Sequence, residues 1–91
     1  MVRTGYYFLS RSGKLYYVSI DGVRGKVVDI DKHVVIEFIS RRPPRPREVE
    51  EFIAAMESNL PIGRLLKEML DAIEVKVYTY EPKKAEVSKE A

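Results

Sequence analysis

The chain has 91 residues, of which 45% are hydrophobic and 33% charged, and this is enough for one domain with a modest core. The absence of cysteine excludes disulfides and thiolate chemistry, and no apolar run approaches the length of a membrane span. The net charge of +2 hides a polarity, because residues 1–47 carry ten Lys and Arg against four Asp and Glu, whereas residues 48–91 carry six against ten.

Residues 1–40 form the basic half and predict an antiparallel meander of four strands. Strand-type residues fill the segments 4–10, 14–20, 26–30 and 33–39, and turn residues separate them. Such short connections require antiparallel neighbours. Alternation gives apolar side chains to both faces of the second and fourth strands, which indicates a curled sheet partly covered by helices.

The segment 41–47, R-R-P-P-R-P-R, predicts an extended connector, because three prolines exclude a helix or a central strand. Three interpretations of its arginines remain open. They could contact phosphate backbones, the segment could be a Pro-rich ligand for an aromatic groove, or the guanidinium groups could pair with Glu48, Glu50 and Glu51 of the same chain.

Residues 48–73 predict an acidic helix pair. The first helix begins near Pro46, carries an apolar stripe and ends near Ser58. The second begins at about Pro61 and runs to residue 73. Residues 74–80 alternate and predict a fifth strand, which completes a single domain over 1–82, and residues 83–91 predict a flexible charged tail. The predicted core contains these residues: Phe8, Val18, Val28, Ile36, Phe38, Val49, Phe52, Ile53, Leu66, Leu70, Ile73 and Val77.

Residues 22–37, G-V-R-G-K-V-V-D-I-D-K-H-V-V-I-E, resemble a KOW-type element of SH3-like barrels. The resemblance implies that Gly22 and Gly25 let the backbone approach RNA, with Arg24 and Lys26 beside them. The fold we expect is therefore α+β: an antiparallel four-stranded meander in the form of an SH3-like half-barrel, followed by two helices and a fifth strand that returns to the sheet.

The sequence predicts no catalytic residue, no cofactor and no metal site, and hence no enzyme. Its candidate binding residues are cations that could neutralise phosphates and tyrosines that could stack on bases. They are Arg11, Lys14, Arg24, Lys26, Arg41, Arg42, Arg45 and Arg47, with Tyr6 or Tyr16.

Two functions are compatible with these features. The first is a small non-enzymatic nucleic-acid-binding module, for DNA or RNA, that uses the basic β half and the connector. The alternative is a protein–protein interaction or self-assembly module, such as a homodimer, that buries leftover apolar surface. We expect a cytoplasmic protein with no membrane partner, and the scarcity of Asn and Gln beside many charges is typical of thermophiles.

Overall fold

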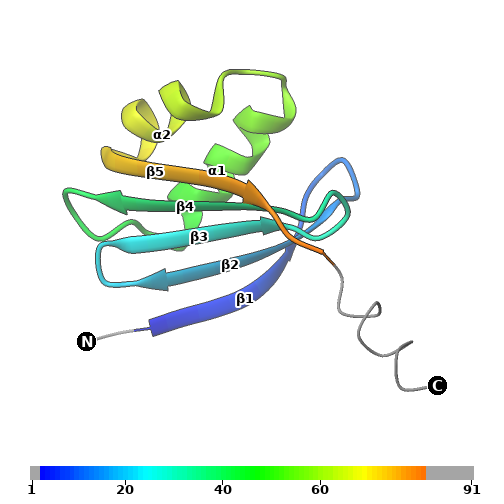
Figure 1. The fold of residues 1–91 in the computed structure, drawn as a ribbon, viewed down its shortest axis with the longest axis horizontal. Helices are drawn as coiled ribbons and strands as arrows, with labels where there is room; N and C mark the ends of the chain where they lie inside the picture. The colour runs from blue at the N-terminus through cyan, green and yellow to red at the C-terminus, as the bar shows by residue number, and fades with distance from the viewer. Residues whose placement is uncertain (1–2, 82–91) are drawn as a thin grey trace.

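The computed structural model describes residues 3–81 (Figure 1). Five strands form one antiparallel sheet in the order β1-β2-β3-β4-β5. Their bounds are β1 Arg3–Leu9, β2 Leu15–Asp21, β3 Arg24–Asp29, β4 Val34–Ser40 and β5 Ala72–Thr79. The expected fold class, a meander followed by two helices and a returning strand, is confirmed. The predicted tail, 83–91, lies outside the described residues.

The turns of the meander follow from residues that tolerate positive φ. Gly22 has φ 62° and occupies the first position of the two-residue turn between β2 and β3, where a type II′ hairpin requires glycine. His33 has φ 58° and ends the turn before β4, so the strand begins one residue later than the alternation predicted. These tight turns keep all four strands in register.

Both helices lie on the same face of the sheet (Figure 1). Helix α1 spans Pro46–Glu57 and α2 spans Ile62–Leu70. Pro46 suits the first turn of α1, and Glu48 accepts a hydrogen bond from the backbone N–H of Arg45 at 3.0 Å. Asp71, with φ 56°, ends α2 three residues before the predicted boundary.

The core lies between the helices and the middle of the sheet. It unites Val18, Val27 and Ile36 of the strands with Phe52 and Leu66 of the helices, all of them almost fully buried. Nine of the twelve predicted core residues lie in this core or pack against it: Phe8, Val18, Ile36, Phe38, Val49, Phe52, Ile53, Leu66 and Leu70.

 A tenth predicted core residue, Val28, is half-buried but lies on the opposite face of the sheet, so it does not join the core beneath the helices.

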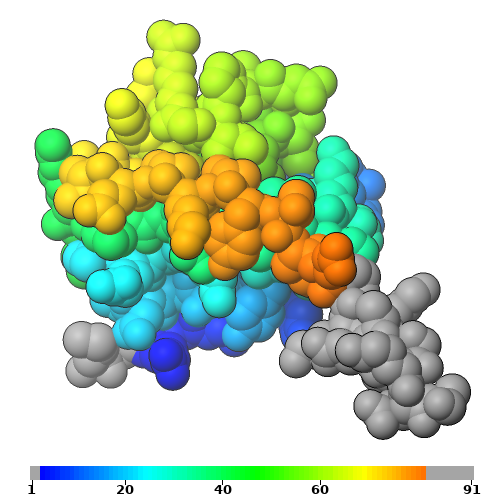
Figure 2. Space-filling model, in the orientation of Figure 1, coloured from blue at the N-terminus to red at the C-terminus, as the bar shows by residue number. Residues whose placement is uncertain are grey.

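The two remaining predicted core residues are exposed, so their prediction is wrong, and both belong to β5. Ile73 is 53% exposed and Val77 is 50% exposed. The pairing of β4 with β5 shifts between Ile39 and Ser40, which leaves Ile73 as the extra residue of a bulge. Helix α2 ends directly before β5, so it covers only Ala72 at the start of the strand. The remainder of β5 is exposed, and its surface faces the viewer in Figure 2.

Candidate interaction surface

The sheet face opposite the helices, which we call the open face, carries an aromatic row. The strand register places Tyr7, Tyr17, Val28, Val35 and Tyr78 side by side across the five strands. Tyr7 is 67% exposed and meets Tyr17 edge to face, with ring centroids 5.1 Å apart. One half of the open face is therefore apolar and partly accessible.

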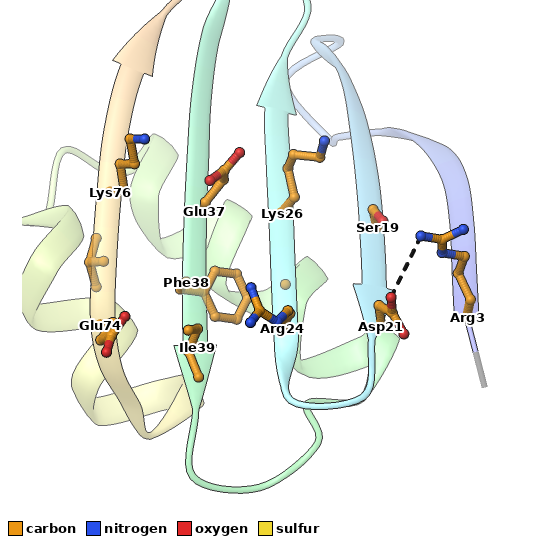
Figure 3. Close-up of a pocket in the computed structure, with 12 residues that line it drawn as sticks. Arg3, Ser19, Asp21, Arg24, Lys26, Glu37, Phe38, Ile39, Glu74 and Lys76 are labelled. Carbon is orange, nitrogen blue, oxygen red and sulfur yellow. Dashed lines mark ion pairs between the residues drawn. The ribbon is translucent and has the colours of Figure 1, made fainter. Parts of the chain in front are cut away.

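The other half of the open face is charged, with signs that alternate across the strands. Lys26, Glu37 and Lys76 form one row, which Figure 3 shows beside Ser19. The next row runs from Arg3 through Asp21 and Arg24 to Ile39 and Glu74, and Arg3 pairs with Asp21 at 3.6 Å.

These two rows line a shallow hollow of about 430 Å³. Four cations and three anions share it, so it presents a mixed field and not a basic one. A polyanion gains little from such a field, because each phosphate near a lysine also lies near a carboxylate. A surface with its own alternating charges would fit it better.

The packing of the sheet beneath the helices leaves no room for a side chain at Gly25. A Cβ atom at Gly25 would lie 2.2 Å from Cζ of Phe38, whose ring covers the strand on the helix side. Gly25 is therefore inside β3 and not in a loop, contrary to the boundary that the sequence predicted. The close approach that this glycine allows is made by Phe38 of the same chain.

The structure does not gather the predicted cations into one patch. Arg24 and Lys26 lie on the open face, within the hollow. Arg11 and Lys14 lie at the end of the sheet where β1 turns into β2, and the connector that begins at Arg41 leaves from the opposite end, after β4. The remaining arginines of the connector, Arg42, Arg45 and Arg47, are exposed around the start of α1.

Two of these cations have partners within the chain. Lys14 Nζ lies 3.0 Å from Oδ2 of Asp29. Arg42 donates two hydrogen bonds to the carboxylate of Glu48, at 3.0 and 3.1 Å. The hydrogen bonds from Arg42 and from the backbone of Arg45 lower the pKa of Glu48. This pairing favours the interpretation of the connector as a linker tied to the acidic helix.

The two tyrosines named for base stacking face the helices. Tyr16 is 1% exposed, so its prediction as a stacking residue is wrong. Tyr6 is half-buried and donates a hydrogen bond to Glu50 at 2.7 Å. Alternation placed Tyr7 and Tyr17 on the other face, but no sequence signal showed which face the helices cover.

Glu57 at the end of α1 anchors the helix to the β1–β2 hairpin. Its Oε2 accepts hydrogen bonds from Tyr16 at 2.8 Å, from Ser10 at 2.8 Å and from Ser12 at 3.0 Å. Burial alone raises the pKa of Glu57, but these hydrogen bonds and the charge of Lys14 lower it overall. Burial, followed by the bond to the carboxylate, raises the pKa of Tyr16 well above 10.

The second accessible feature is the edge strand β5. Seven of its eight residues are exposed. Ile73, Val75 and Val77, which we call the β5 strip, are 53%, 40% and 50% exposed. Val75 and Val77 pair with Phe38 and Ile36 of β4 and so share their helix-side face. The strip thus continues the face of the core past the point where α2 stops.

The comparisons with known proteins give no match: no family model fits the sequence, and no curated protein or solved structure is significantly similar to the chain. Within residues 3–81, no helix is long and apolar enough to cross a membrane. Over the same residues, no three His, Asp or Glu side chains lie close enough together to hold a metal ion.

Proposed function

We propose that this protein is a non-catalytic protein–protein interaction module that associates with further copies of itself. The observation that carries the proposal is the β5 strip. Its apolar residues alternate as in a strand with one buried face, yet within residues 3–81 only Ala72 of that strand is buried. A long exposed edge strand with apolar side chains is a template for another chain unless something protects it.

The open face supports the same function. Tyr7, Leu9 and Tyr78 add exposed apolar surface to it, and the hollow beside them carries alternating charges. Interfaces between proteins combine an apolar centre with charges of both signs at the rim. Surfaces of this composition are suited to a protein partner more than to a phosphate backbone.

Nucleic-acid binding is the second candidate, and a specific feature favours it. Arg24 and Lys26 are exposed on the open face, and among the described residues neither makes an ion pair within 4.0 Å. Exposed Tyr7 lies on the same face and offers a ring on which a base could stack. A single strand would then lie across the sheet, between the aromatic row and the charged rows.

Sedimentation velocity over a protein dilution series tests the proposed function. We expect the weight-average mass to rise with concentration toward a dimer or a larger assembly. A chain that stays monomeric at the highest concentration would contradict self-association. Fluorescence anisotropy with labelled single- and double-stranded DNA and RNA tests the second candidate, which requires affinity that falls steeply with added salt.

A further inference from the structure

We propose that two copies of the chain pair edge to edge through β5, antiparallel about a two-fold axis, with Val75 of one copy opposite Val75 of the other. The inference rests on the proposed self-association and adds the surface and the register. The paired sheets would form one continuous sheet of ten strands, with the helices of both copies on the same side.

The hydrogen bonds of β5 decide which residues are free to pair. The backbone N–H of Tyr80 donates a hydrogen bond to the carbonyl of His33 at 3.0 Å, so the backbone N–H and C=O groups of Tyr80 face β4. In an antiparallel strand the backbone groups of successive residues face the two neighbouring strands in turn, so those of Lys76 and Tyr78 also face β4. The N–H and C=O groups of Val75 and Val77 therefore point away from β4, toward the free edge.

Charge selects one register among the symmetric pairings of these outward groups. A two-fold axis at Lys76 would place two lysines directly opposite each other, which is unfavourable. An axis at Val77 would leave Glu74 and Lys76 facing tyrosines of the second copy. An axis at Val75 places Glu74 opposite Lys76 of the second copy, and the symmetry repeats that contact.

The same register covers the β5 strip. On the helix side, Val75 meets Val75, and Ile73 meets Val77 of the second copy. The strip adjoins a hollow of about 410 Å³ lined by Gly63, Lys67 and residues of β5. A Cβ atom at Gly63 would meet no described atom within 4 Å, which leaves room for side chains of the second copy beside α2.

The opposite edge, β1, lacks these features. Tyr6 and Phe8 already pack against the core, and Tyr6 is bonded to α1. The only charged residue of β1, Arg3, lies 3.6 Å from Asp21 on β2. On the helix side, a symmetric pairing of two β1 strands therefore gains no uncovered apolar strip, and it gains no complementary charges. The exposed apolar residues of β1, Tyr7 and Leu9, lie on the open face, so β5 is the edge whose helix-side strip and charges fit a second copy.

Charge reversal gives a test that separates pairing from folding. Glu74→Lys leaves only positive charges at positions 74 and 76, and Lys76→Glu leaves only negative ones. In the proposed register each variant sets like charges opposite each other twice, so we expect the dimer dissociation constant to rise at least about tenfold. An equimolar mixture of the two variants restores both opposite-charge contacts and should form heterodimers of near wild-type affinity.

Sedimentation velocity measures the mass of each variant, of the mixture and of the double variant Glu74→Lys/Lys76→Glu, which also restores complementarity. Matched controls are Glu51→Lys and Arg11→Glu, which reverse exposed charges on α1 and in the β1–β2 turn, away from β5, and should dimerise like the wild type. A variant that merely misfolds cannot regain a dimer on mixing, so the mixture reports on the interface alone.

The outcomes separate this inference from the proposed function. A wild-type chain that is monomeric at every concentration overturns both. A wild-type dimer that survives both single reversals overturns only the β5 pairing and leaves self-association through another surface, such as the open face. Single variants that are monomeric and stay so when mixed overturn the register centred on Val75.

Discussion

The two edge strands of the sheet differ in how far the helices cover them. In both β1 and β5 the side chains alternate between the two faces of the sheet, and each strand has one neighbouring strand. On β1 the helix-side residues Tyr6 and Phe8 pack against the core, and Tyr6 is bonded to Glu50 of α1. On β5 the helix-side residues Val75 and Val77 are exposed.

Whether helices cover one face of an edge strand therefore depends on where the helices end and not on the alternation of the strand itself. Helix α1 carries Glu50 and Glu57, which reach the β1 side of the sheet. Helix α2 has nine residues, and the single residue Asp71 separates it from β5. Helix α2 therefore covers only the start of β5, and the apolar residues that follow are exposed and can contact another chain.

The largest effect on the free energy of unfolding is expected at a core residue of α1, the helix that packs on the β1 side of the sheet. Phe52 is fully buried at the centre of the core. Phe52→Ala should lower the free energy of unfolding by about 3–5 kcal/mol, because it removes a large side chain and leaves a cavity. Denaturant unfolding followed by circular dichroism measures it. An unchanged midpoint would mean that α1 does not cover this side.

The next effect concerns the tie between α1 and the β1–β2 hairpin. Glu57→Gln should cost about 1–2 kcal/mol at neutral pH, because three hydrogen bonds to a carboxylate become bonds to an amide. The exposed Glu51→Gln on the same helix is the matched control and should change stability much less.

The pH dependence of the Glu57 variant gives a second readout. The folded state lowers the pKa of Glu57 below its ordinary value of 4.5, so its contribution is present above that pH and is lost as the pH falls through the folded pKa. The stability difference between wild type and Glu57→Gln should therefore shrink in acid. A difference that stays constant from neutral to acidic pH would contradict this role.

A smaller effect is expected at the β1 edge. Tyr6→Phe removes the hydrogen bond to Glu50 and should cost about 1 kcal/mol at neutral pH. Burial, and then the bond to Glu50, raise the pKa of Tyr6 above 10, so this contribution is present below pH 10 and is lost at higher pH. Thermal unfolding should show the two proteins converging in alkali, whereas Tyr7→Phe, an exposed position, should differ little from wild type throughout.

The smallest effect is expected on β5. Val77→Ala should change the stability of the dilute monomer by less than about 0.5 kcal/mol, because the side chain is half exposed. Val27→Ala is the matched control in the same cross-strand row, where the side chain is fully buried, and should cost several times more. Equal losses for the two variants in dilute solution would show that β5 is covered within a single chain.

Much of the fold followed from local patterns in the sequence. The alternation of strands 15–21 and 34–40 gave their faces correctly, and the stripe of Val49, Phe52 and Ile53 gave the buried side of α1. These assignments succeeded because strand and helix periods are set by the backbone, so neighbouring residues determine them. The prolines of segment 41–47 likewise separated the meander from the helices.

The candidate surface depended on contacts between distant residues. Alternation separated Tyr6 from Tyr7 and Tyr16 from Tyr17, but only the placement of α1 showed that Tyr6 and Tyr16 face inward. The dispersal of the arginines and the exposure of Val77 likewise depend on strand order and on where α2 ends. A local pattern fixes which side chains share a face, whereas the packing of helices on the sheet decides which face is buried, because that choice balances the burial of the whole chain.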